Sequence, residues 1–102
     1  MGSPITQNEK DYLNELDETL YQTRERYRDA TGATKLEIAE EYNKLVEKKS
    51  EIMKKILTDN LVFSEAEIES ISSSAKDIEQ AAETQQVVSL VAGVLVKYID
   101  FT

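Results

Sequence analysis

The side chains of this sequence that could carry out chemistry are almost all carboxylates. Twenty of the 102 residues are Asp or Glu, and adjacent pairs occur, for example Asp17 with Glu18 and Glu40 with Glu41. Paired carboxylates can act as general acid and base, or as ligands of a hard cation. Here they fall on the charged faces of predicted helices, where such side chains are ordinarily solvated. We therefore expect no catalytic residue among them.

The partners that catalysis usually requires are missing from the composition. There is no His and no Cys, which removes the common general base, the thiol nucleophile and the usual ligands of zinc. A Ser or Thr hydroxyl would have no imidazole to activate it. The glycines, at positions 2, 32 and 93, form no phosphate-binding loop, and no acidic run carries the glycine of a calcium loop. The sequence predicts a protein that is not an enzyme and that holds no cofactor and no metal.

The charge is acidic and unevenly distributed. Twelve basic and twenty acidic residues give a formal net charge of −8. Residues 1–31 carry a net charge of −3, residues 33–60 are neutral, and residues 61–102 carry a net charge of −5. Binding to phosphate backbones or to anionic membrane surfaces needs the opposite balance. We expect a protein partner and no nucleic acid, and an acidic decoy of a basic, nucleic-acid-binding protein is an alternative function.

Three segments open with the sequence of a helix capping box, in which a hydroxyl residue is followed three positions later by Glu. They begin at Thr6, Thr34 and Ser64. Gly32 is placed to end the first helix in the left-handed conformation that glycine tolerates. The sequence therefore predicts three helices, at about residues 7–30, 35–58 and 65–98, within a single domain over residues 1–102. Polar stretches at 72–74 and 84–86 are the weak places of the third helix.

Apolar residues recur at alternating steps of three and four in all three segments, which places them on one face of each helix. The second segment carries an additional stripe of Ala39, Val46, Met53 and Leu57. Two apolar faces suit a helix with two neighbours, so we expect this helix in the middle. Lys49, on its core-facing stripe, should reach solvent or meet an acid of a neighbouring helix. The predicted fold class is all-α: an antiparallel three-helix bundle, or a helical hairpin with a long third helix, with coiled-coil-like packing.

The most apolar part of the chain is its C-terminal end. A third helix antiparallel to the second would extend past the hairpin by about ten residues, or roughly 15 Å. That overhang would be apolar on all faces, and such a surface is normally buried. The predicted function is therefore a non-enzymatic helical interaction module that self-associates or binds a protein partner through residues 87–99, with Gly93 allowing close approach. The predicted interface residues are Val87, Val88, Leu90, Val91, Gly93, Val94, Leu95, Tyr98 and Ile99.

Other arrangements of this segment stay open. The third helix could break near residues 84–86, so that a short fourth helix folds back over the bundle. Membrane insertion is disfavoured, because residues 87–99 are fewer than the ~20 of a membrane-spanning helix. The chain could also be a fragment of a larger helical toxin or scaffold protein. No secretory signal is visible at the N-terminus, so the expected location is cytoplasmic, and export without a cleaved signal stays open.

Overall fold

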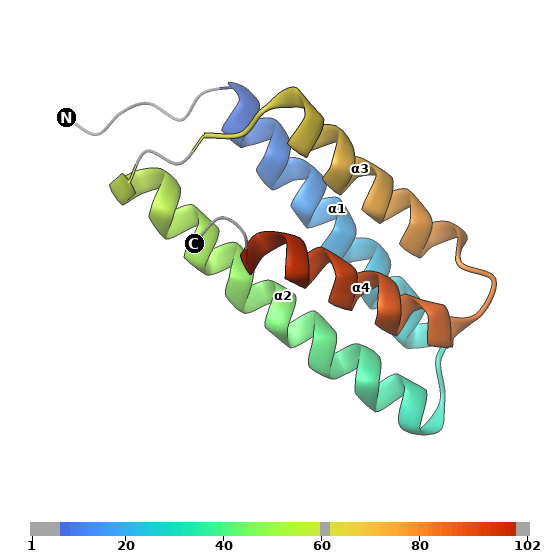
Figure 1. The fold of residues 1–102 in the computed structure, drawn as a ribbon. Helices are drawn as coiled ribbons and strands as arrows, with labels where there is room; N and C mark the ends of the chain where they lie inside the picture. Colours follow the sequence, from blue (N-terminus) through green and yellow to red (C-terminus); the bar gives the residue numbers. More distant parts are fainter. Residues whose placement is uncertain (1–6, 60–61, 100–102) are drawn as a thin grey trace.

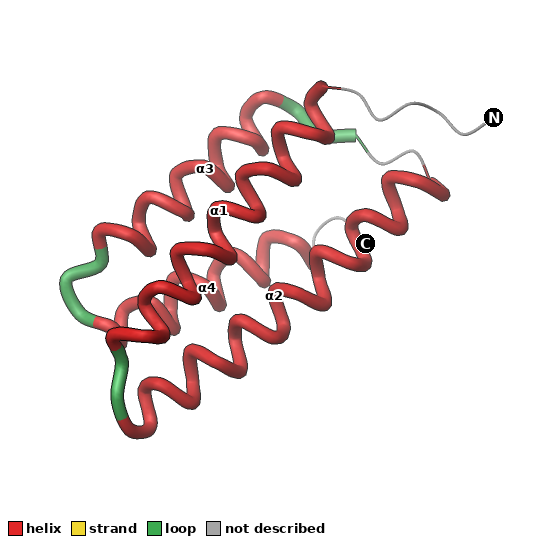
Figure 2. The backbone as a smooth tube through the Cα atoms, turned by 180° about the vertical axis from the view of Figure 1, so that it is seen from behind, coloured by secondary structure: helices red, strands yellow, loops and turns green. Residues whose placement is uncertain are grey.

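The computed structural model describes residues 7–59 and 62–99, the side chains of 59, 98 and 99 excepted. Within these ranges the chain is all-helical and has no strand, which confirms the predicted all-α class. The helices are α1 (Gln7–Asp29), α2 (Gly32–Asp59), α3 (Glu65–Gln80) and α4 (Thr84–Ile99). They lie side by side in an elongated molecule of 48 × 21 × 20 Å. Successive helices run in opposite directions (Figure 1 and, from behind, Figure 2).

The start of α3 is the capping box that its sequence predicts. The backbone N–H of Glu67 donates to the Ser64 hydroxyl at 3.2 Å, and the backbone N–H of Ser64 donates to Glu67 Oε1 at 3.0 Å. Two backbone donors at the helix end, which would otherwise lack a partner, are satisfied in this way. The box at Thr6 lies outside the described residues.

The turn between α1 and α2 is tighter than the sequence suggests. Gly32 has a φ of +60°, as predicted for the residue that ends the first helix. However, α2 already begins at Gly32, so the capping box predicted at Thr34 is wrong. Thr34 lies within the first turn of α2, and its hydroxyl donates to Gln85 Oε1 of α4 at 2.9 Å.

The single long helix predicted for residues 65–98 is also wrong, because this segment forms the two helices α3 and α4. Ile71 and Ile78 are buried on α3, and a continuous helix would next present Gln85 to the core. The next buried apolar residue is instead Val87. In a continuous helix Val87 would lie on the opposite face from Ile78. A turn at residues 81–83 lets both sets of apolar residues reach one core, and this is the fold-back alternative that the sequence left open.

Hydrogen bonds from side chains hold this turn in place. The backbone of Ala81 leaves the helical conformation, and its carbonyl oxygen accepts from the Arg26 guanidinium of α1. The backbone N–H of Glu83 donates to Gln86 Oε1 at 3.3 Å. These bonds satisfy backbone groups that the break exposes at the end of α3 and before the start of α4.

Both α1 and α4 contact all three of the other helices. The helix α2 contacts α1 and α4 and, within the described residues, makes no contact with α3. As predicted, α2 therefore has two neighbouring helices, but it does not lie in the middle, because α1 and α4 each contact three helices. The alternative given for Lys49 in which it meets an acid is confirmed, because its ammonium group pairs with the Asp17 carboxylate of α1.

The core draws on all four helices and on the segment before α3. Leu16, Ile38, Ile78 and Val91 are fully buried, one from each helix. The ring of Tyr12 is stacked on that of Phe63, with the ring centroids 3.7 Å apart. Burial of apolar side chains is the main favourable contribution to folding. The buried face of each helix is therefore part of the core and is not available to a partner.

Candidate interaction surface

The largest exposed apolar side chains of α2 lie on one face of that helix. They are Leu36, Val46, Met53 and Leu57, with exposed fractions of 69%, 39%, 41% and 62%. At about 100° per residue, steps of seven and four keep Val46, Met53 and Leu57 within about 40° of one another, whereas Leu36 lies roughly 60–100° from them, toward the charged side of the helix. Together with Ala39, which is half-buried, we name these residues the α2 stripe. It runs from residue 36 to residue 57, or about 32 Å at 1.5 Å per residue.

The stripe stays open because of the place that α2 takes in the bundle. Its buried residues Ile38, Leu45, Ile52 and Ile56 form its contact face toward the core, and the stripe lies beside that face. Sequence reasoning recognised Ala39, Val46, Met53 and Leu57 as a second apolar face and expected a second neighbouring helix to cover it. It missed Leu36, although a leucine three residues before Ala39 continues the same alternation of three and four.

Charged residues flank the stripe on the side away from the core. Glu40 and Glu47 flank its first half, and Lys54 flanks its second half. All three are exposed, and none forms an ion pair within the described residues. The ion pairs within α2 join other residues: Lys44 with Glu41 at 3.3 Å, and Lys48 with Glu51 at 3.1 Å. These three flanking charges are therefore available to a partner.

The C-terminal segment predicted to be the interface is largely part of the chain's own core. Val87, Val91, Val94 and Leu95 are buried, and Val88 and Leu90 are half-buried against the same cluster. Gly93 is exposed, and a Cβ added to it would meet no atom within 4 Å. The side chains of Tyr98 and Ile99 lie outside the described residues. The expected overhang does not form, because α4 folds back along α2 (Figure 1).

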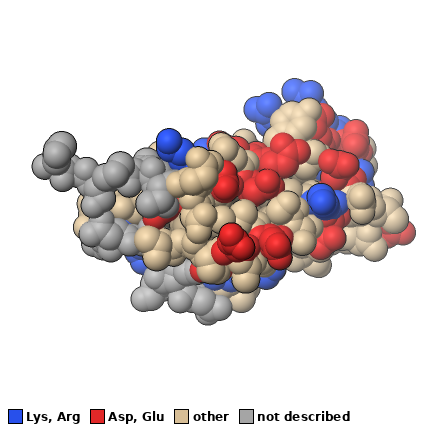
Figure 3. All heavy atoms as spheres, turned by 90° about the horizontal axis from the view of Figure 1, so that it is seen from above, with Lys and Arg blue, Asp and Glu red and all other residues tan. Residues whose placement is uncertain are grey.

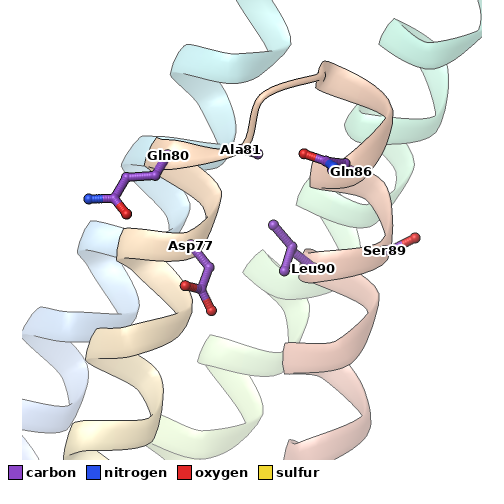
Figure 4. Close-up of a pocket in the computed structure, with 6 residues that line it drawn as sticks. All are labelled: Asp77, Gln80, Ala81, Gln86, Ser89 and Leu90. Atoms are coloured by element: carbon purple, nitrogen blue, oxygen red, sulfur yellow. The ribbon is translucent and has the colours of Figure 1, made fainter.

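A groove of about 530 Å³ lies between the end of α3 and the start of α4 (Figure 4). Figure 4 shows Leu90 directed into the gap between the two helices, whereas Ser89 and Gln80 point away from it. Its polar residues are exposed, so none of them is held in a dry environment that would strengthen a polar contact. The lining residues are Asp77, Gln80, Ala81, Gln86, Ser89 and Leu90.

A second groove, of about 320 Å³, follows the contact between α1 and α3 and is acidic. Glu15 and Glu18 of α1 and Glu79 of α3 line it together with Lys76. Gln22 bridges the two helices there, donating to Glu18 Oε1 at 2.9 Å and to Glu79 Oε2 at 3.0 Å. The space-filling view in Figure 3 shows acidic side chains gathered across one face of the molecule. This groove could attract a cationic side chain.

Within residues 7–59 and 62–99, no cluster of three or more His, Cys, Asp or Glu side chains is arranged to hold a metal ion. In the same ranges, no helix combines the length and the apolar character needed to cross a membrane.

Comparison with known proteins gives no relative. No protein family, no curated protein and no solved structure matches this chain.

Proposed function

We propose that this chain is a non-enzymatic helical protein–protein interaction module, built on an antiparallel bundle with coiled-coil-like packing, that binds protein through the α2 stripe. The observation that carries the proposal is the row of exposed apolar residues from Leu36 to Leu57. Apolar residues that recur along one helix face and are rimmed by charged residues are typical of surfaces that bind another helix, and here Asn43 and Ser50 lie between them. Scattered exposed apolar residues would need no such explanation.

The proposal places the contact on α2 instead of on residues 87–99. Val87, Val91 and Val94 are fully buried within the chain itself and would have to leave their own core to reach a partner. Exposing such a side chain costs about 1.5–3 kcal/mol each. The residues of the α2 stripe incur no such cost, because they are already exposed in the folded chain.

A matched pair of variants tests this proposal. In Val46→Glu/Met53→Glu, two exposed stripe residues become charged residues of high helix propensity, so the fold should be retained. Val96→Glu, an exposed valine on α4, adds a charge outside the stripe. Proteins that bind the wild type and Val96→Glu but not the stripe variant are then purified. The affinity of each purified protein for the three chains is measured directly. If no protein, including a second copy of the chain, distinguishes the stripe variant from the other two, the proposal is wrong.

The acidic groove between α1 and α3 supports a second candidate function, an acidic decoy that binds the basic surface of a nucleic-acid-binding protein. Glu15, Glu18 and Glu79 converge there and give that side of the molecule a concentrated negative charge. Binding by such a surface depends on charge and weakens as salt is added. Titration of a basic partner against wild type and Glu15→Gln/Glu18→Gln tests it. Equal affinity of the two chains, or binding that persists at about 0.5 M salt, would exclude this function.

A further inference from the structure

We infer that the occupant of the α2 stripe is a second copy of this chain, bound with its α2 helix antiparallel to the first. This inference rests on the proposed function and names the partner of the same surface. Three features of the chain favour a second copy: the distribution of charge over the whole chain, the order of charge along α2, and the residue pattern of the stripe.

The α2 helix is where two copies can approach each other at the least electrostatic cost. Each copy has a net charge of −8, so most pairs of surfaces repel. Residues 33–60, which include nearly all of α2, have six basic and six acidic residues and are neutral. The segments before and after carry net charges of −3 and −5. A strongly basic partner would be drawn to those acidic segments, whereas a copy of the same chain would avoid them.

The charges along α2 are ordered in a way that favours an antiparallel pair. Residues 33–47 contain two basic and four acidic residues, and residues 48–59 contain four basic and two acidic residues. Antiparallel pairing places the negative half of one copy against the positive half of the other. At the edge of the stripe, Glu40 of one copy would face Lys54 of its partner, and the two-fold axis repeats this pair, while the two Glu47 side chains would meet near the axis and repel each other. Parallel pairing would place like halves together.

The spacing of residues along the stripe also fits a pair of helices. Residues 36, 39, 43, 46, 50, 53 and 57 alternate steps of three and four, as the contact positions of a two-stranded coiled coil do. Asn43 and Ser50 occupy two of these positions, and both are exposed. Polar residues at isolated contact positions weaken a coiled coil but fix its register and the number of chains. A contact along one helix face is small, so the dimer should be weak and dependent on concentration.

The experiment that tests association is the mass of the full chain in solution, measured by sedimentation equilibrium from ~1 µM to ~1 mM, a range that covers weak dimers. The wild type should rise from 11.6 kDa toward twice that mass. Val46→Glu/Met53→Glu should stay at 11.6 kDa throughout, and the control Val96→Glu should dimerise as the wild type does. Far-UV circular dichroism establishes that all three chains are folded.

Charge exchange tests the antiparallel orientation. Glu40→Lys places two lysines together at each end of the interface and should weaken the dimer about tenfold, since both symmetry-related pairs are lost. Adding Lys54→Glu recreates the pair with its charges exchanged and should restore the wild-type dissociation constant. No such rescue is expected of a parallel dimer, in which these two residues do not face each other.

The outcomes separate this inference from the proposed function. A wild type that is monomeric at every concentration overturns the second copy as occupant, and the function still stands if another protein binds through the stripe. A dimer that Val96→Glu dissociates and the stripe variant does not would place the interface on α4. A dimer that depends on the stripe but is not rescued by charge exchange would overturn the antiparallel arrangement alone.

Discussion

Gly93 lies within α4, a helix that is otherwise largely apolar. A small residue in an apolar helix suggests close approach of a second backbone. In the structure Gly93 lies on the exposed side of α4, and a Cβ added there would meet nothing within 4 Å. Glycine within a helix is less favourable than alanine because it loses more backbone freedom on folding. Gly93→Ala should therefore stabilise the chain by about 0.5–1 kcal/mol, as measured by urea denaturation.

The variant Gly93→Ala also distinguishes an interface on α2 from an interface on α4. Under the α2 arrangement, Gly93→Ala leaves the dissociation constant of the dimer unchanged while the midpoint of denaturation rises. A loss of association in Gly93→Ala would mean that α4 approaches a partner at this residue. A fall in stability would mean that the space around Gly93 is occupied.

The pair of Lys49 with Asp17 is a polar contact at the border of the core between α1 and α2. The Asp17 side chain is half exposed, and exposed pairs of this kind contribute roughly 0–1 kcal/mol. Asp17→Asn should accordingly lower the free energy of unfolding by no more than about 1 kcal/mol. Leu45→Ala, on the same side of α2 but fully buried, should cost about 2–5 kcal/mol. Equal losses for the two variants in urea denaturation would show that the ion pair is more important to packing than its exposure indicates.

At the scale of the helix, α4 contains two valines that should respond in opposite ways to the same substitution. Val91 is 0% exposed and Val96 is 62% exposed. Val91→Asp would place a carboxylate without a partner in the core, and we expect it to destabilise the chain by more than about 3 kcal/mol. Val96→Asp should change the stability by about 0.5 kcal/mol or less. Thermal denaturation followed by circular dichroism compares the two directly.

The pair of valine variants also tests whether α4 belongs to the fold. If α4 were an unattached overhang, Val91→Asp would abolish association and leave the helices before it as stable as in the wild type. Equal melting temperatures for Val91→Asp and Val96→Asp would thus favour the overhang and contradict the folded-back α4.

The helices themselves could be predicted from the sequence because their signals are local. The box at Ser64 and Glu67, the glycine at position 32 and the spacing of the apolar residues each act over a few residues. The break between α3 and α4 was harder to predict, because no Pro or Gly marks it. The signal present is a change of phase: the apolar residues up to Ile78 follow one register, and Val87 and Val91 follow another.

The candidate surface could be predicted only in part. The pattern of Ala39, Val46, Met53 and Leu57 established that α2 has a second apolar face, but a periodicity does not say what covers it. That depends on which helices become neighbours, and α2 makes no contact with α3 in the described part of the chain. For the same reason the sequence placed the contact at residues 87–99, since it could not show that α4 reaches the core by folding back.

At the scale of the whole molecule, the net charge of −8 determines how association should respond to salt. Two copies repel over a distance that falls from ~30 Å at 0.01 M salt to ~10 Å at 0.1 M. The apolar contact along α2 is not weakened by this screening, although the Glu40–Lys54 pairs lose part of their attraction. We expect the dimer to strengthen between ~0.02 M and ~0.3 M salt, because the loss of long-range repulsion outweighs the loss of two exposed pairs. The mass measured by light scattering at a fixed concentration follows this change.

The sign of the salt effect separates the two proposed functions, because an acidic decoy loses affinity for a basic partner over the same range. A mass that falls as salt is added would show that charge pairs dominate the contact between copies, contrary to an interface centred on Val46 and Met53. The variant Val46→Glu/Met53→Glu provides the control. If its mass rises with salt as much as that of the wild type, the added association does not need the apolar side chains of Val46 and Met53 and uses some other face of the molecule. A rise confined to chains with an intact stripe would identify α2 as the surface at which this acidic molecule meets its copy.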